Sequence, residues 1–330
     1  MATYSTIKGF NIESLASDPP APQEGQVWYN TTSTVLKGFG KQGALSWSAG
    51  ATLSTSRQQT QGAGAGVSTA LVFSGRTGAT TTTQNTEKYD GTSWTEVNNT
   101  VGGRYSCYGC GTQTAALFVS GLTTPPVALS VNVEEWDGTS WTEKANVADG
   151  RSYTAGCGIT TASLFIGGYH PAGPTYRVQS VEDYDGSSWT EVADLQNAVN
   201  SMGAASQGTP SSALIYGGYS SPGPSNRTEE FDGTSWAETA NLNTSRSAPN
   251  GSGIQTAALA SGGEPPSTIK NVESYNGSTW TETSYDMGSG GYWGAYGGSS
   301  TSAFVAGRVP YSNITEELEA ASTTKTFTAS

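Results

Sequence analysis

The sequence is poor in the side chains that carry out most protein chemistry. It contains a single histidine, His170, and only three cysteines among 330 residues, and charged residues make up 13% of the chain. One histidine leaves little scope for a Ser-His or Cys-His nucleophile or for a histidine-based metal site. We therefore expect no enzyme, no bound metal and no cofactor.

Basic side chains are scarce as well. Lys and Arg number 15 against 27 Asp and Glu, which gives a formal charge of −12. Nucleic acids and anionic membranes bind through clusters of Lys and Arg, so we expect neither as a partner. No apolar run approaches the length of a membrane-spanning helix, and Met1–Ser5 does not begin a signal peptide. We expect a soluble chain that is made in a cytoplasm and does not insert into membranes.

What the sequence does contain is one segment written five times. In the first copy, Thr86–Trp94, an aromatic residue leads into Asp90-Gly91 and a tryptophan follows. An alternating strand, an Asp-Gly or Asn-Gly turn and a second strand predict a β-hairpin. The spacings between successive tryptophans are 47, 48, 47 and 44 residues, the range of four-stranded propeller blades. These tryptophans are Trp94, Trp141, Trp189, Trp236 and Trp280.

The rest of each repeat supplies two more strands. A polar segment that runs into glycine is often opened by an arginine, and a short apolar run closed by glycine follows it. The apolar runs are apolar on both faces, as expected for strands packed between neighbouring sheets. They lie at residues 70–73, 116–119, 163–166, 213–216, 258–260 and 303–305.

The two ends of the repeat array complement each other. Trp47 stands 47 residues before Trp94 with no repeat in front of it, and the last unit, which ends at Ile314–Leu318, has no tryptophan strand after it. We predict that the closing blade takes its last strand from Ala44–Ala49 and the others from residues 292–319. The predicted fold class is all-β, a six-bladed β-propeller of four-stranded blades whose ring is closed by strands from both termini.

In its details the repeat resembles the kelch motif. Gly167-Gly168, then Tyr184 and Trp189, occur in a unit of about 47 residues, and the resemblance covers roughly residues 45 to 320. The doubled glycine is altered in places, to Ser74-Gly75, Ser120-Gly121 and Ala306-Gly307. Kelch-like propellers include enzymes, adaptors and adhesins, so the resemblance implies a fold and leaves the function open.

The sequence divides into three predicted parts. Residues 1–24 form an N-terminal docking arm and Pro-rich linker, residues 25–322 the propeller, and residues 323–330 a C-terminal tail. Residues 17–22 suit an extended linker. The arm would become ordered only against a partner, as disordered segments often do. Its apolar anchors are Ile7, Phe10, Ile12 and Leu15.

The opening of the chain also resembles the starts of virion and tail-fibre proteins of marine bacteriophages. The resemblance rests on a short polar leader, the Pro-rich spacer and Gly25–Thr32, in a chain of low-charge, Ser/Thr/Gly-rich repeats. It implies a structural component of a phage tail or fibre, located in the virion after assembly in the host cytoplasm, with the arm bound to other virion proteins. Fibre proteins are usually trimers, so a homo-oligomer is an option.

A second interpretation of the whole chain stays open. It is a cellular or secreted kelch-type interaction scaffold or lectin. A signal peptide would favour secretion and an appended partner domain would favour an adaptor, and we see neither.

The segment after the second strand differs from repeat to repeat. Up-and-down connectivity puts these segments on one face, opposite the uniform Asp-Gly hairpins. They concentrate tyrosine and arginine, which suit weak stacking and hydrogen-bonding contacts to sugars that many copies would strengthen. We predict that this face binds a host cell-surface glycan or receptor; the alternative is a passive spacer with solvent loops. The predicted ligand-binding residues are Tyr169, His170, Tyr176, Arg177, Tyr219, Arg227, Arg308 and Tyr311.

Three repeated features have both a structural and a chemical interpretation. Six glutamates in register could form a cation or catalytic ring, but catalysis needs a unique constellation, so pairing with arginines and backbone amides between blades is favoured. Aspartates at the hairpin turns suit local backbone bonds rather than calcium. Aromatic–tryptophan pairs such as Tyr89 and Trp94 suit packing rather than sugar stacking. The glutamates are Glu87, Glu134, Glu182, Glu229, Glu273 and Glu316, and the aspartates Asp90, Asp137, Asp185 and Asp232.

The cysteines do not indicate a disulfide framework. Cys107, Cys110 and Cys157 are an odd number, and the last two occupy the same place in successive repeats. We predict small buried thiols near the ring axis rather than a metal site or a disulfide.

Overall fold

The computed structural model describes residues 12–264 and 267–327. Their regular secondary structure is almost entirely β, and η2 (Pro174–Tyr176), a short 3-10 helix, is the only helix in the two ranges. None of the described segments forms a helix long and apolar enough to cross a bilayer.

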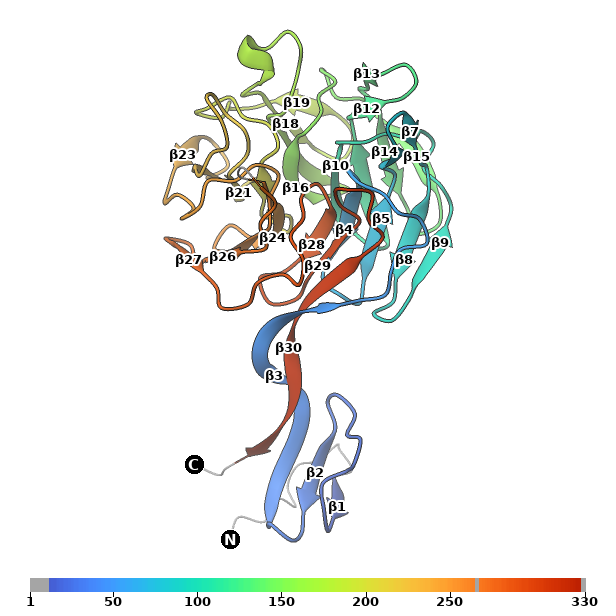
Figure 1. Ribbon diagram of the computed structural model, residues 1–330, viewed down its shortest axis with the longest axis vertical. Coiled ribbons are helices and arrows are strands. Elements are labelled where there is room, and N and C mark those ends of the chain that lie inside the picture. The colour runs from blue at the N-terminus through green and yellow to red at the C-terminus, as the bar shows by residue number, and fades with distance from the viewer. Residues whose placement is uncertain (1–11, 265–266, 328–330) are drawn as a thin grey trace. The chain divides into compact units, whose positions relative to one another are not determined.

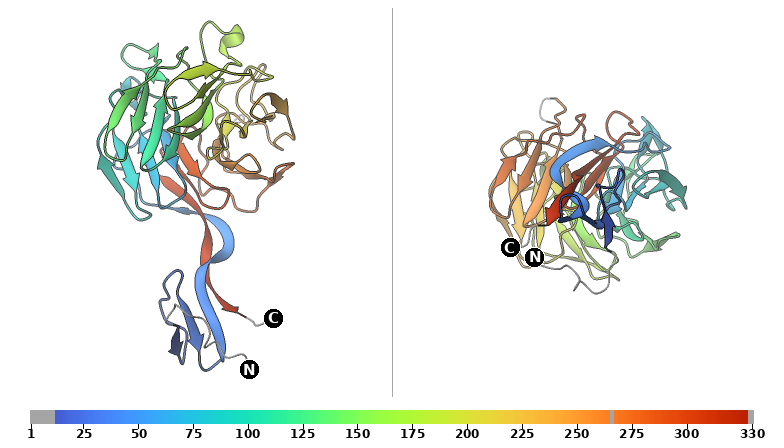
Figure 2. Two further views of the ribbon diagram at one scale, coloured as in Figure 1. Left: turned by 180° about the vertical axis from the view of Figure 1, so that it is seen from behind. Right: turned by 90° about the horizontal axis from the view of Figure 1, so that it is seen from below.

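Five four-stranded antiparallel sheets form blades of a β-propeller (Figures 1 and 2). The second strand of each blade is an apolar run of the sequence, and the third and fourth strands are the Asp-Gly or Asn-Gly hairpin, so both predictions are confirmed. In chain order the blades consist of β4 (Gln61–Gly64), β5 (Ala70–Phe73), β8 (Thr86–Tyr89) and β9 (Trp94–Val97); β10 (Tyr108–Thr112), β11 (Ala115–Val119), β14 (Val133–Trp136) and β15 (Trp141–Lys144); β16 (Ala155–Ile159), β17 (Ala162–Ile166), β18 (Val181–Tyr184) and β19 (Trp189–Glu191); β20 (Gly203–Ala204), β21 (Ala213–Tyr216), β22 (Thr228–Phe231) and β23 (Trp236–Glu238); β24 (Asn250–Ile254), β25 (Ala257–Ser261), β26 (Val272–Tyr275) and β27 (Trp280–Glu282).

A further sheet has six strands in the order β1-β2-β3-β30-β29-β28. Two small two-stranded sheets lie in the segments that follow β5 and β11. The six strands are β1 (Glu13–Leu15), β2 (Val27–Asn30), β3 (Val35–Ala49), β28 (Ala295–Gly298), β29 (Ala303–Ala306) and β30 (Thr315–Phe327), and the small sheets pair β6 (Arg76–Gly78) with β7 (Thr81–Thr82) and β12 (Leu122–Thr123) with β13 (Ala128–Leu129).

The chain divides into two compact units. The larger spans Trp47–Leu318, and the smaller consists of Met1–Ser46 together with Glu319–Ser330. The propeller boundaries predicted at residues 25 and 322 differ from this division. The physical reason is that two long strands cross the boundaries: β3 begins before the repeat array, and β30 continues beyond it.

In the smaller unit, β2 and the start of β3 form the hairpin that the sequence predicted, and β1 pairs with β2 in parallel. The predicted extended linker is held against this hairpin, because Asp18 accepts hydrogen bonds from Trp28 Nε1, Asn30 Nδ2 and Lys37 Nζ at 3.1, 2.7 and 2.7 Å. The Lys37 bond is the main cause that lowers the pKa of Asp18 to about 2.

The predicted docking anchors fall into two groups. Ile12 and Leu15 are half-buried, and Leu15 lies in β1. Ile7 and Phe10 lie outside the described residues.

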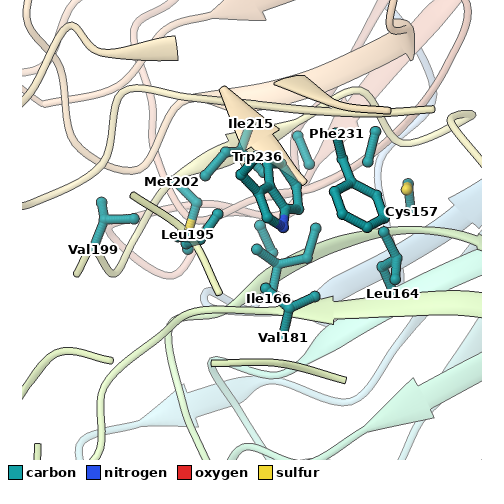
Figure 3. Close-up of a cluster of buried hydrophobic side chains, with 13 residues drawn as sticks. Cys157, Leu164, Ile166, Val181, Leu195, Val199, Met202, Ile215, Phe231 and Trp236 are labelled. Atoms are coloured by element: carbon teal, nitrogen blue, oxygen red, sulfur yellow. The ribbon is translucent and has the colours of Figure 1, made fainter. Parts of the chain in front are cut away.

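The propeller core lies between blades. In the first blade all four residues of the second strand, β5, are fully buried. One core cluster joins β17 and β18 of the third blade to β21, β22 and β23 of the fourth (Figure 3). The first strands lie side by side about the centre of the propeller: β10 contacts β4 and β16, β20 contacts β16 and β24, and β28 contacts β24 and β4. The apolar second strands therefore pack between neighbouring sheets.

The hairpin turns and the cysteines have the structures that the sequence predicted. Asp90 Oδ1 accepts the backbone N–H groups of Thr92 and Ser93, both at 2.8 Å. Cys107, Cys110 and Cys157 are buried and free.

Candidate functional site

Six residues, which we call the collar, each stand two positions before an innermost strand, on the face that carries the variable loops. Their φ angles lie between 50° and 55°, in the left-handed region that such residues adopt only when surrounding structure holds them there. Five backbone bonds of 2.6–3.1 Å connect them. In the four bonds from Gln59 to Ala248 the N–H of each residue donates to the carbonyl of the residue before it, and in the fifth Gln59 N–H donates to the Trp293 carbonyl. The collar residues are Gln59, Ser106, Tyr153, Ser201, Ala248 and Trp293.

The collar backbone repeats, but its side chains do not. Tyr153 and Trp293 contact each other, with ring centroids 5.3 Å apart, and Gln59 Nε2 donates a hydrogen bond to Tyr153 Oη at 3.2 Å. A glutamine, a tyrosine and a tryptophan thus meet at the centre of an otherwise repetitive ring. This is the unique, asymmetric constellation that the repeated glutamates cannot provide.

An aromatic run connects the collar to the variable loops. Tyr292 lies 5.0 Å from Trp293, Trp293 contacts Tyr153, and Tyr153 lies 6.5 Å from Tyr169. Tyr169 in turn stacks on Tyr176 at 5.9 Å and 16°. The run leads from the centre of the propeller to Tyr176, which is 59% exposed.

A cavity of about 40 Å³ lies at the collar. Several polar atoms of its lining are inaccessible to solvent and have no hydrogen-bond partner among the described residues; they are Trp293 Nε1, Ser106 Oγ, Thr154 Oγ1 and Asn250 Oδ1. Burial raises the pKa of Tyr296, which also lines the cavity, to about 12, so its hydroxyl keeps its proton. Donors and acceptors beside aromatic rings suit a ligand that carries hydroxyl groups.

The structure brings four of the predicted ligand-binding residues together. Tyr169 and Tyr176 stack, Tyr169 pairs with Arg177 as a β-bridge, and the Arg177 guanidinium carbon lies 4.7 Å from the centre of the Tyr219 ring. His170 lies beside them, where its Nδ1 accepts the N–H of Ala172 at 3.2 Å.

Two other predicted residues stand apart. Arg227 donates a hydrogen bond from Nη1 to Asn197 Oδ1 at 2.7 Å and lies 3.6 Å from Glu238. Tyr311 is 36% exposed and belongs to the segment after β29. Among the described residues, neither makes a ring contact with the aromatic run.

The prediction for Arg308 is wrong. Its residue exposure is only 2%, and it forms a buried ion pair with Glu316 and donates a hydrogen bond to Ser289 Oγ at 2.8 Å. The reason is that a glycine, Gly291, occupies the usual arginine position of this repeat, and the Arg308 side chain lies in the space that a side chain there would fill. A Cβ added to Gly291 would lie 2.0 Å from Arg308 Cδ. Arg308 therefore fills the place of a repeat arginine and is not available to a ligand.

The sequence interpretation missed Tyr153, Trp293 and Gln59. A signal was present, because each collar residue stands two positions after the arginine position of its repeat, as Gln59 follows Arg57 and Tyr153 follows Arg151. The side chain at that position varies from repeat to repeat.

The repeated glutamates are structural partners. Five of them form buried ion pairs, Arg57–Glu87, Arg104–Glu134, Arg151–Glu182, Arg246–Glu273 and Arg308–Glu316. They also accept backbone amides, as Glu182 accepts the N–H of Ala148 at 2.8 Å. Within the described ranges no group of three or more His, Cys, Asp or Glu is placed to hold a metal ion.

A second pocket, of about 200 Å³, lies at the opposite ends of the innermost strands. Its lining includes Gly111, Gly158, Ile159 and Gln207 and contains no charged or aromatic side chain. The collar and the aromatic run are therefore the better candidate site.

The chain was compared with known proteins. No protein-family model matches it, and no curated protein matches it.

Proposed function

We propose that the protein is a non-enzymatic, kelch-like component of a bacteriophage tail or fibre and that its variable-loop face binds a carbohydrate on the host cell surface. The resemblance of the opening segment, Gly25–Thr32, supports the virion setting. The aromatic run from Trp293 to Tyr176 is the observation that carries the binding role.

We further propose that the propeller has six blades and that strands from both ends of the chain complete the sixth. Three observations support this. The six-stranded sheet contains the run β3-β30-β29-β28, β28 contacts both β24 and β4, and the collar bonds connect Gln59 to Trp293.

Carbohydrate suits this site better than a peptide or an anion does. Sugar rings stack on aromatic faces through their C–H groups, and their hydroxyls both donate and accept hydrogen bonds, which matches the unpartnered Trp293 Nε1 and Asn250 Oδ1. Arg177 adds planar donors at the outer end of the run. Each contact is weak, and many copies on one particle would strengthen adsorption.

Adsorption of the full-length chain to host cells tests the proposal. Tyr176→Ala and Arg177→Ala should each weaken binding about tenfold, which corresponds to about 1.4 kcal/mol. Ile254→Ser is the control, because Ile254 is 47% exposed and ends β24 on the opposite face. Adsorption unchanged by both loop substitutions would leave the propeller as a passive head. Mass spectrometry of purified particles tests the virion setting, and absence of the chain would refute it.

A further inference from the structure

The fourth blade breaks the arginine pattern of the repeat. The position two residues before the collar holds an arginine in four repeats, but it holds Val199 in the fourth blade and Gly291 in the last unit. In the last unit Arg308 supplies the guanidinium from elsewhere and pairs with Glu316. Nothing comparable occurs in the fourth blade, so Glu229 is the repeated glutamate without an arginine.

Glu229 is nevertheless as buried as its counterparts. It is 3% exposed, and its carboxylate accepts the N–H groups of Gln196 and Asn197 at 2.8 and 3.2 Å and Asn197 Nδ2 at 3.3 Å. No Lys or Arg of the described residues forms an ion pair with it. Burial raises the pKa of this carboxyl group, while the amide bonds oppose the rise.

The backbone that receives the guanidinium in the other blades is retained. In the third blade Arg151 Nη1 donates to the carbonyls of Gly167 and Ser180 at 3.0 and 2.6 Å, and Gly167 N–H donates to the Ser180 carbonyl at 3.0 Å. In the fourth blade Gly217 and Arg227 hold the same positions, and Gly217 N–H donates to the Arg227 carbonyl at 2.9 Å. The acceptors thus remain although the donor is gone.

A pocket of about 10 Å³ lies at this place, lined in part by Val199, Gly217, Ser225, Arg227 and Glu229. Val199 belongs to the apolar cluster of Figure 3 and brings no polar atom. This volume holds about one water-sized sphere.

We propose that the pocket binds one water-sized monovalent cation, K⁺ or NH₄⁺, in place of the missing guanidinium. A buried carboxylate without a countercharge is strongly destabilising, and carboxylate and carbonyl oxygens suit hard cations. A single carboxylate matches a single charge. Arg227 lies at the rim, where Asn197 and Glu238 hold its guanidinium, and its side chain is 48% exposed. The site goes beyond the proposed glycan binding and does not depend on it.

Thermal unfolding of the full-length chain at constant ionic strength tests this site. With KCl or NH₄Cl replacing tetramethylammonium chloride, Tm should rise with the logarithm of the salt concentration once that concentration exceeds the dissociation constant, by about 4 °C at a thirtyfold excess. A response to both ions would show that size and charge decide binding; a response to NH₄⁺ alone would show that donated hydrogen bonds decide it. Glu229→Gln should abolish the rise, whereas Glu135→Gln, at an exposed ion pair, should keep it.

Two results would overturn the proposal. One is a Tm that is the same in all salts, and the other is a rise that persists in Glu229→Gln. Val199→Arg should supply the guanidinium internally and remove the response. If that variant does not fold, Arg227→Gln is the deciding variant. The rise of Tm with KCl or NH₄Cl should remain in Arg227→Gln. A rise found in Arg227→Gln but not in the natural chain would identify Arg227 as the native countercharge instead.

Discussion

Trp94 donates a hydrogen bond from Nε1 to Thr315 Oγ1 at 3.0 Å, across 221 positions of the sequence. The same bond recurs elsewhere in the ring, from Trp141 to Thr86 and from Trp280 to Thr228, both at 3.0 Å. The threonine directly precedes a repeated glutamate each time. In the second and fifth blades the indole is thus attached to the third strand of the blade before it, and in the first blade it is attached to β30.

Removing these threonine hydroxyls should have unequal effects. Thr86→Val should lower the free energy of unfolding by about 1–2 kcal/mol, because Trp141 Nε1 has no second acceptor among the described residues. Thr315→Val should lower it less, because Trp94 Nε1 also bonds to the Ala51 carbonyl at 3.0 Å. Denaturant unfolding followed by tryptophan fluorescence measures both, and a larger loss for Thr315→Val would contradict the assignment.

The buried ion pairs should matter far more than the exposed ones. Arg151→Met leaves Glu182 charged and buried, and should lower the free energy of unfolding by about 3–5 kcal/mol. Lys144→Met breaks the exposed pair with Glu135 and should change it by less than about 1 kcal/mol. Thermal and denaturant unfolding measure both variants. If Arg151→Met and Lys144→Met lowered the free energy of unfolding equally, the buried arginines would not be needed to neutralise the repeated glutamates.

Much of the propeller could be predicted from local chemistry. The tryptophan period and the Asp-Gly turns identify the hairpins, because Gly91 needs a positive φ of 95° and Asp90 accepts the backbone N–H groups of Thr92 and Ser93. The pairing of repeated arginines with repeated glutamates followed from their matching recurrence. These features are encoded within one repeat, so five copies reinforce one another.

The collar and the long outer strands could not be predicted in the same way. Tyr153 and Trp293 adopt positive φ without being glycine, so no residue type marks the bend. Their contact joins repeats that are far apart in sequence, and only the packing of the first strands against one another brings them together. The course of β30 past Leu318 depends on pairing partners that no repeat supplies.

The turn aspartates should make the fold sensitive to acid. Hydrogen bonds, first from the Thr92 hydroxyl and the Ser187 hydroxyl, lower the pKa of Asp90 and Asp185 from 3.8 to about 2. A lowered pKa stabilises the fold above the unfolded value, and that stability is lost as pH falls from about 4 to 2. Replacing both with Asn, as in the natural turn at Asn276, should reduce the fall of Tm between pH 4 and 2 and should lower Tm at pH 7, because Asn cannot carry the charge; an unchanged acid slope would contradict this.

Two deletions at the N-terminal end should have opposite effects on the folding of the propeller. Deleting residues 1–50 removes Trp47 and Gly50, whose N–H donates to the Thr315 carbonyl at 3.0 Å, and should prevent the propeller from folding. Deleting residues 1–22 leaves these residues in place and should preserve it. Near-ultraviolet circular dichroism and Tm report the outcome, and a folded 51–330 chain would contradict closure by both ends.

A glycan array probed with the full-length chain tests the claim that the collar and its aromatic run hold a glycan. We expect binding to a restricted set of glycans, weakened about tenfold by Trp293→Leu, which removes both the ring and its unpartnered N–H. Ile254→Ser should bind as the natural chain does. Binding to no glycan, or equal binding by a folded Trp293→Leu variant, would contradict the claim.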